Sequence, residues 1–295
     1  VQCTWCSGNI PSQKTITGRN EVTFRGVEEV LQSIREAISY GYETFHICFD
    51  PYPKEPKYFL DLFSRIREEG IRMECSFECF GLPTLHFIKS FNETFPGSKS
   101  WIVLSPDVGS DRLRKMHKGN AYTNRDLMEC LDQLRQHGVF CDVFFTIGVP
   151  FEKEADLHQT VRLQREIRNR YPNVRGIRTF TIGMEPGAPW HFDPKAFRVK
   201  SSLENFMDFY HSHSGEESAF SSLGYWIPDY FEGVEDGRGF EERLQNVKCR
   251  HFCFIHPNAR KSSTPFWGRR LCDLSSLFWK AKNLAKKGGG CDETF

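Results

Sequence analysis

The sequence predicts an α/β fold, a partial (β/α)6 barrel followed by a mixed, mainly helical extension after residue 190. Three observations lead to this prediction. Short apolar segments alternate with amphipathic ones at nearly regular intervals between residues 24 and 182, which implies parallel strands joined by right-handed crossovers. Too few strands are recognisable for a closed eight-stranded barrel. After Trp190 the alternation gives way to segments rich in aromatic residues, glycine and serine.

The individual elements follow from the spacing of apolar residues and from the turn residues between them. Apolar side chains recur at intervals of three and four in several segments, which predicts helices over 24–40, 57–69, 84–95, 124–137, 154–170 and 271–286. Short, largely apolar segments lie between them, which predicts strands over 44–49, 72–79, 101–104, 140–149 and 177–182. A six-stranded barrel needs one more strand before Cys3, so we expect the chain to begin inside a longer protein. The expected domains are a barrel over 1–190 and an extension or cap over 191–295.

Composition excludes several classes of protein. The 295 residues carry 39 Lys and Arg against 38 Asp and Glu, which argues against binding nucleic acid through bulk charge. No run of 18 apolar residues predicts a membrane span, and the N-terminus has no signal-peptide pattern. Eleven cysteines form an odd set, which argues against complete disulfide pairing. We therefore expect a cytoplasmic protein, without a membrane partner, in which some thiols bind metal.

The most informative motif is the CxxC pair formed by Cys3 and Cys6. This spacing lets two sulfur atoms converge on one point, so it occurs in zinc sites, in thiol–disulfide exchange and in iron–sulfur sites. The pair precedes the first recognisable helix of the repeating β/α pattern. A redox pair is instead expected at the start of a helix that follows a strand. No accompanying His, Asp or Glu spacing supports a zinc-dependent hydrolase.

Three further motifs follow predicted strands. In such folds the active-site and ligand-binding residues lie at the carboxyl ends of the strands. The first is Ser105-Pro106-Asp107-Val108-Gly109-Ser110-Asp111, followed by Arg114, Lys115, Lys118 and Gly119. The second is Phe145-Thr146-Ile147-Gly148-Val149-Pro150-Phe151-Glu152. The third is Met184-Glu185-Pro186-Gly187-Ala188-Pro189.

Taken in order, these motifs resemble those of the radical S-adenosylmethionine (radical SAM) enzymes over residues 1–190. Within that family they resemble the branch that usually carries an upstream cobalamin-binding domain. Cys3 and Cys6 match the second and third cysteines of the family motif CxxxCxxC. Its first cysteine would lie four residues before Cys3, so the chain is expected to start inside this motif. Asp107 stands where the family usually has Glu.

The resemblance implies a 4Fe–4S cluster bound by Cys3 and Cys6, with S-adenosylmethionine (SAM) at the open iron. One-electron cleavage of SAM would give a 5′-deoxyadenosyl radical for methylation or rearrangement of a small-molecule substrate. An electron donor such as flavodoxin or ferredoxin, and cobalamin in the full-length protein, are also implied. The resemblance assigns no catalytic residue. The residues it implies around the cofactors are Ser7, Gly8, Asp107, Ser110, Gly148, Pro150 and Gly187.

Several alternatives remain open from the residues alone. The chain could be a non-catalytic metal-binding barrel, or a zinc or redox protein using its CxxC pair. Asp107 and Ser110 could only cap the next helix, and Gly148 and Pro150 could serve an ordinary strand-to-helix turn. Cys249 and Cys253, with His256 nearby, could bind an auxiliary metal, but we favour buried core cysteines. Core positions are also expected for Cys48, Cys75, Cys79, Cys130 and Cys141.

Overall fold

The computed structural model describes residues 3–19, 23–50, 57–118, 122–182, 185–201, 203–205, 207–209 and 225–226. All of them belong to the first of two compact units, Val1–Glu232. The expected helix over 271–286 and the cysteines Cys249 and Cys253 lie outside the described residues. The proposed division at residue 190 stays an expectation.

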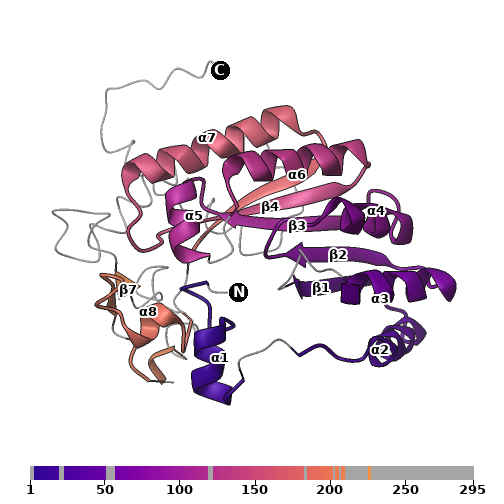
Figure 1. Ribbon diagram of the computed structural model, residues 1–295, viewed down its shortest axis with the longest axis horizontal. Helices are drawn as coiled ribbons and strands as arrows, with labels where there is room; N and C mark the ends of the chain where they lie inside the picture. Colours follow the sequence, from indigo (N-terminus) through magenta and orange to yellow (C-terminus); the bar gives the residue numbers. More distant parts are fainter. Residues whose placement is uncertain are drawn as a thin grey trace, which may run out of the picture. The chain divides into compact units, whose positions relative to one another are not determined.

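A five-stranded parallel sheet forms the centre of this unit, with the strands side by side in chain order (Figure 1). The α/β prediction is therefore confirmed, and five parallel strands in this order fit a partial barrel. The strands are β1 Thr44–Asp50, β2 Glu74–Cys79, β3 Trp101–Asp107, β4 Phe140–Ile147 and β5 Val174–Thr181.

Helices join successive strands, as right-handed β/α connections require. They pack their apolar stripes against one face of the sheet (Figure 1). These helices are α2 Val27–Ser39, α3 Lys57–Glu68, α4 Leu85–Thr94, α6 Asn124–Gln136 and α7 Glu154–Arg170. The remaining elements are the short helices α1 Ile10–Thr17, α5 Asp111–His117 and α8 Pro189–Phe192, and the two-residue strands β6 Lys200–Ser201 and β7 Tyr225–Trp226.

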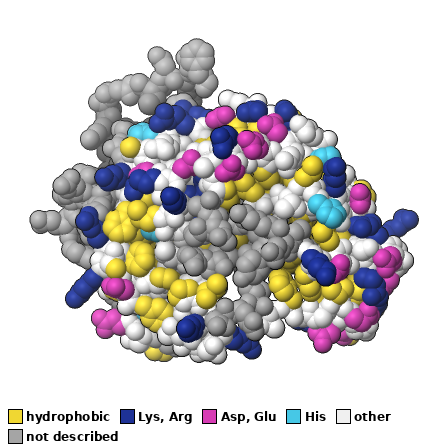
Figure 2. All heavy atoms as spheres, in the orientation of Figure 1, with side chains coloured by type: hydrophobic (Ala, Val, Ile, Leu, Met, Phe, Trp, Pro, Cys, Tyr) yellow, Lys and Arg dark blue, Asp and Glu magenta, His cyan; other side chains and the backbone are white. Residues whose placement is uncertain are grey.

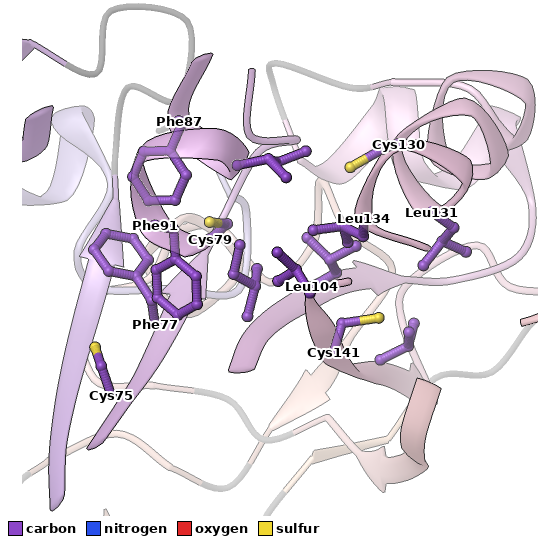
Figure 3. Packing of buried hydrophobic residues seen from close by; sticks show 14 of the residues in the cluster. Cys75, Phe77, Cys79, Phe87, Phe91, Leu104, Cys130, Leu131, Leu134 and Cys141 are labelled. Carbon is purple, nitrogen blue, oxygen red and sulfur yellow. The ribbon is translucent and has the colours of Figure 1, made fainter. Parts of the chain in front are cut away.

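The core lies between the sheet and its helices and contains four of the cysteines. Phe77 packs edge to face against Phe87 at 4.9 Å between ring centroids, and both rings are fully buried (Figure 3). This apolar environment raises the pKa of the Cys75, Cys130 and Cys141 thiols and keeps them protonated. The expectation that these cysteines are core residues is confirmed for Cys75, Cys79, Cys130 and Cys141.

The opposite face of the sheet carries polar side chains. His46 of β1 lies beside Ser76 of β2 in the parallel register, and the imidazole Nδ1 forms a hydrogen bond with the Ser76 hydroxyl. The imidazole Nε2 lies 3.8 Å from the Glu78 carboxylate. Because side chains alternate between the two faces of a strand, Cys75, Phe77 and Cys79 are buried under the helices while Ser76 and Glu78 point the other way.

Gly109 allows the segment after β3 to pack closely against α7. A Cβ at this position would lie 2.3 Å from the Thr160 Cα, and the Gly109 N–H donates to the Thr160 hydroxyl at 2.8 Å. We expect Gly109→Ala to lower the free energy of unfolding by ~2–3 kcal/mol, the usual effect of overpacking a rigid site. Denaturant unfolding measures this.

The matched control is Gly26→Ala, because the added Cβ there would meet its nearest atoms at an ordinary 3.6 Å. It should change the free energy of unfolding by less than ~1 kcal/mol. Equal effects of the two alanines would contradict the close approach of α7.

The described surface carries charges of both signs. Figure 2 shows Lys and Arg interspersed with Asp and Glu over the described part of the face in view. This agrees with the near balance of 39 basic and 38 acidic residues. Within the described ranges, no helix has the length and apolar character that crossing a membrane requires.

Candidate functional site

The CxxC pair lies in a loop that leads directly into α1. Asn9 caps this helix, since its side-chain oxygen accepts from the Ser12 N–H at 2.9 Å. The Asn9 amide also donates to the Cys6 carbonyl, and Gln13 donates to the Ser7 carbonyl at 3.0 Å. The end of the cysteine loop is therefore tied to the first turn of α1.

The turn after β5 holds the same loop from another side. One Glu185 carboxylate oxygen accepts from the Ser7 N–H at 2.8 Å and from the Ser7 hydroxyl at 3.0 Å. The Trp190 N–H donates to the Thr4 carbonyl at 3.3 Å. Gly187 lies between these contacts with φ of 78°, and a Cβ there would approach the Ile16 Cδ1 to 2.6 Å. The turn after β5 thus holds Ser7 of the cysteine loop, and Gly187 lets that turn lie against α1.

Burial makes both thiols of the CxxC pair hard to ionise. Burial raises the pKa of Cys3 to about 12, against the opposing effect of the Lys118 ammonium. Burial also raises the pKa of Cys6 to about 11, and the nearby Glu185 carboxylate adds to this shift. Thiolates are the metal-binding form, so binding of a metal here must displace protons.

Gly8 leaves room for the Cys6 sulfur. Its N–H donates to the Cys6 Sγ at 3.2 Å, and a Cβ on Gly8 would lie 3.3 Å from the same sulfur, tighter than most real contacts. N–H donors to sulfur stabilise the thiolates of iron–sulfur sites. The interpretation of Gly8 as a residue beside the metal is therefore consistent with its surroundings.

Asp107 ends β3 with its carboxylate against Lys118. The ammonium donates to the carboxylate at 2.5 Å and also to the Ser105 carbonyl. Both side chains are almost inaccessible, and Lys118 remains charged because Asp107 outweighs the effect of burial, so that its pKa is raised. Asp107 also has φ of 61°, a left-handed conformation that Asp tolerates better than most residues. Lys118 acts electrostatically on Cys3, which connects this ion pair to the CxxC pair.

Ser110 faces α7. Its hydroxyl donates to the Asp156 carboxylate at 2.6 Å, and Arg112 donates to the other oxygen of that carboxylate at 2.6 Å. Ser110 stands at the N-cap position of α5 without making a side-chain capping bond. The alternative that Ser110 only caps this helix is therefore wrong. The assignment of Ser110 to the cofactor site stays a prediction.

The buried Arg114 keeps the segment after β3 in shape. Its guanidinium donates to the backbone carbonyls of Pro106, Val108 and Tyr122 and to the side chains of Asp111 and Asn124. A guanidinium has five N–H groups in a fixed plane, and here it binds the start of α6 to the end of β3. The loop bearing Asp107 and Ser110 is consequently rigid.

The turn after β4 contains Gly148 and Pro150. Gly148 has φ of 85°, a conformation in which side chains are strained, and its N–H donates to the Glu152 carboxyl at 2.7 Å. Pro150 presents its carbonyl to the His117 Nε2 at 2.8 Å. Glu152 is fully buried, and its other oxygen has no hydrogen-bond partner among the described residues.

Two residues connect predicted segments that the sequence motifs left separate. His117 contacts both Thr4 and Pro150, and Glu185 holds Ser7, 178 positions away in sequence. Lys118 pairs with Asp107 inside one motif. In the sequence, Ser76 and Glu78 alternate with apolar neighbours. This alternation could have predicted the polar face of the sheet.

Comparison with known proteins identifies the family. A profile of the radical SAM superfamily matches residues 1–164, and this match covers more than half of the chain. The chain belongs to the radical SAM superfamily. A search among curated proteins finds no significant match.

Solved structures of radical SAM enzymes share the fold. TsrM from Kitasatospora setae, a radical SAM methyltransferase with cobalamin and a [4Fe-4S] cluster bound, has a TM-score of 0.54 at 13% identity, over 68% of this chain and 40% of TsrM. The structure of TsrM with tryptophan substrate and the SAM analogue aza-SAM has a TM-score of 0.53 at 13% identity, over 69% and 40%.

OxsB, a cobalamin-dependent SAM radical enzyme with aqua-cobalamin bound, has a TM-score of 0.56 at 10% identity, over 94% of this chain and 44% of OxsB. At these identities the likeness shows the fold alone. The chain spans less than half the length of either protein.

The residues present fit the cluster that this superfamily implies. Two unpaired thiols lie three positions apart in one loop, beside an N–H donor to sulfur and next to a residue that must stay small. Within the described part of the chain, no third Cys, His, Asp or Glu joins them in a group that could hold a metal. The donor set therefore matches two of the three thiolates in CxxxCxxC.

Proposed function

We propose that this chain binds a 4Fe–4S cluster through Cys3 and Cys6 and cleaves SAM reductively to modify a small-molecule substrate. The observation that supports this most is that hydrogen bonds of His117 and Glu185 link the CxxC loop to all three other motif segments. Those segments follow β3, β4 and β5, where ligands bind in parallel β/α folds. When bound, the cluster and SAM supply a 5′-deoxyadenosyl radical.

In this proposal the chain's own residues position the cofactors and exclude water. Asn9 and Glu185 fix the cysteine loop from opposite ends. The turn at Gly148 offers backbone rather than side chain to the nucleoside. Asp107 has one carboxylate oxygen on Lys118, and the other would be the acceptor for a ribose hydroxyl. Gly187 lets the turn after β5 approach α1, where it would border the cofactor.

The proposal extends to the reaction class and its partners. We propose methylation or rearrangement of a small molecule with cobalamin in the full-length protein, supported by the likeness in fold to TsrM and OxsB. We also propose a soluble electron donor such as flavodoxin or ferredoxin, a cytoplasmic location, and residues 191–295 as a cap over the substrate. His46, Ser76 and Glu78 on the polar face of the sheet are the proposed contacts for polar groups of that substrate.

Alanine at either ligand cysteine tests the cluster. The full-length protein, reconstituted anaerobically, should bind about four irons and four sulfides per chain, and Cys3→Ala or Cys6→Ala should abolish this binding. Cys79→Ala, a core cysteine away from the loop, is the control and should keep the iron. Stoichiometric zinc without iron would contradict the proposal and favour a zinc protein.

Gly148 tests the position of the nucleoside. Gly148→Ala places a side chain on a backbone with positive φ in the turn, so we expect SAM affinity to fall at least about tenfold while iron content is retained. The control is Gly70→Ala, which carries the same strain at φ of 64° in open space at the end of α3. It should cost ~1–2 kcal/mol of stability and leave SAM affinity unchanged. Equal affinities in both variants would place the nucleoside elsewhere.

A further inference from the structure

His117, the last residue of α5, makes two side-chain hydrogen bonds to different predicted cofactor segments. Its imidazole Nδ1 lies 2.7 Å from the Thr4 hydroxyl, and its Nε2 lies 2.8 Å from the Pro150 carbonyl. A carbonyl oxygen can only accept, so Nε2 carries the proton and Nδ1 accepts from the Thr4 hydroxyl. The two contacts therefore fix one tautomer of the ring.

The surroundings keep this imidazole neutral and immobile. The side chain is completely buried, and burial lowers its pKa to about 4. The Thr4 N–H donates to the His117 carbonyl at 2.9 Å. The ring of Trp5 lies 5.4 Å from the imidazole, and the ring of Phe151 is stacked on it at 6.3 Å. The hydrogen bonds and ring contacts of His117 thus connect the segment of Thr4 and Trp5 with the segment of Pro150 and Phe151.

These two segments have separate tasks in the proposed function. Thr4 lies inside the CxxC motif, between the two ligand cysteines, and Pro150 lies two residues beyond Gly148 in the turn assigned to the nucleoside. The cluster and the nucleoside end of SAM must be held at one fixed separation for the cofactor to reach the open iron. One rigid side chain connects the segments that set this separation.

We propose that His117 is a positioning residue that sets the cysteine loop at the correct distance from the SAM-binding turn. The proposal rests on the proposed function and adds a residue that no family motif assigns. By contrast, the Ser110 and Asp156 pair connects α5 only to α7. Loss of the His117 side chain should therefore change how SAM binds at the cluster, because it removes contacts to both segments.

Two pairs of variants in the full-length protein separate the two hydrogen bonds. Glutamine retains a donor near the Nε2 position and loses the acceptor for Thr4, whereas asparagine retains an acceptor near Nδ1 and loses the donor to Pro150. Thr4→Val removes the hydroxyl from the other side, and Thr4→Ser restores it. His86→Gln on the exposed surface of α4 is the control for the substitution itself.

Iron content, the SAM dissociation constant, the electron paramagnetic resonance (EPR) spectrum of the reduced cluster with and without SAM, and thermal unfolding are measured on each variant. Iron content should stay at the wild-type level. The SAM dissociation constant should rise about three- to tenfold in His117→Gln, His117→Asn and Thr4→Val, with an altered SAM-induced change in the EPR spectrum. Thr4→Ser and His86→Gln should match the wild type.

A double variant tests whether both partners act through one hydrogen bond. Since Thr4→Val and His117→Gln remove the same bond, combining them should weaken SAM binding no further than either alone. Unchanged SAM affinity and EPR spectra, with only the melting temperature lowered, would overturn the positioning role. So would fully additive effects in the double variant. A wild-type protein that binds neither iron nor SAM would overturn the proposed function, and this inference with it.

Discussion

Replacing Asp107 with asparagine is expected to lower the free energy of unfolding by ~3–5 kcal/mol, the usual effect of removing one partner from a buried ion pair. Asparagine keeps the shape and tolerates the positive φ of this position, so the lost charge dominates. Lys118 would then be left as a buried ammonium without a counter-charge, with the neutral Ser105 carbonyl and the asparagine amide oxygen as acceptors. Urea unfolding at neutral pH measures the change.

Two controls separate this effect from general damage. Lys118→Met combined with Asp107→Asn removes the buried charge and should recover part of the loss. Glu129→Ala breaks the exposed pair with Arg125, whose ions lie 3.8 Å apart, and should change stability by less than ~1 kcal/mol. A decrease below ~1 kcal/mol in the free energy of unfolding of Asp107→Asn would contradict the burial of this ion pair, because it would mean that solvent reaches Lys118.

Glu152→Gln is expected to flatten the dependence of stability on pH. Burial raises the pKa of Glu152 to about 8 from an ordinary value of 4.5, although the Gly148 N–H opposes the shift. Between these two pH values the folded protein holds a proton that the unfolded chain releases. Stability contributed by the protonated form is therefore complete below pH 4.5 and is lost progressively as the pH rises to about 8. The full difference between the two pKa values corresponds to roughly 4–5 kcal/mol of folding stability.

Glutamine resembles the protonated acid and cannot ionise. The free energy of unfolding of the variant should therefore be close to that of the wild type near pH 5 and higher than that of the wild type near pH 8. Urea unfolding at several pH values compares the two proteins, and the difference between them isolates this one carboxyl. Glu129→Gln on the exposed face of α6 is the control and should leave the wild-type pH dependence in place. Parallel curves for Glu152→Gln and wild type would show that Glu152 is ionised in the folded state.

The larger elements were predictable because their burial is periodic along the chain. The apolar stripe of 154–170 predicted α7 with the bounds that the structure has, Glu154–Arg170. The β3 strand extends to Asp107, beyond the expected end at residue 104. Ser105 and Pro106 are buried in this strand although neither residue type is typical of a buried strand, so the apolar pattern ended too early. Apolar patterns thus located the sheet well and the polar ends of its strands less well.

The short helices near the site escaped prediction for a physical reason. The sequence of α1 has no apolar periodicity, and the helix exists because Asn9 caps it and Pro11 suits its first turn. The seven residues of α5 are too few to show a repeat. Such segments take their conformation from capping residues and tertiary contacts rather than from an apolar repeat.

The residue types at the site could be predicted, but their partners could not. The motifs predicted which turns carry Asp107, Gly148 and Gly187, since family resemblance operates on local sequence. The hydrogen bonds between Thr4 and His117 and between Ser110 and Asp156 join residues 113 and 46 positions apart. Only the fold brings such pairs together.

The most direct test of the central claim is the EPR spectrum of the reduced, iron-reconstituted full-length protein, recorded before and after SAM is added. We expect the signal of one reduced 4Fe–4S cluster, a change in that signal on addition of SAM, and loss of both in Cys3→Ala and Cys6→Ala. A cluster signal that SAM leaves unchanged, or one that persists in both cysteine variants, would contradict the account.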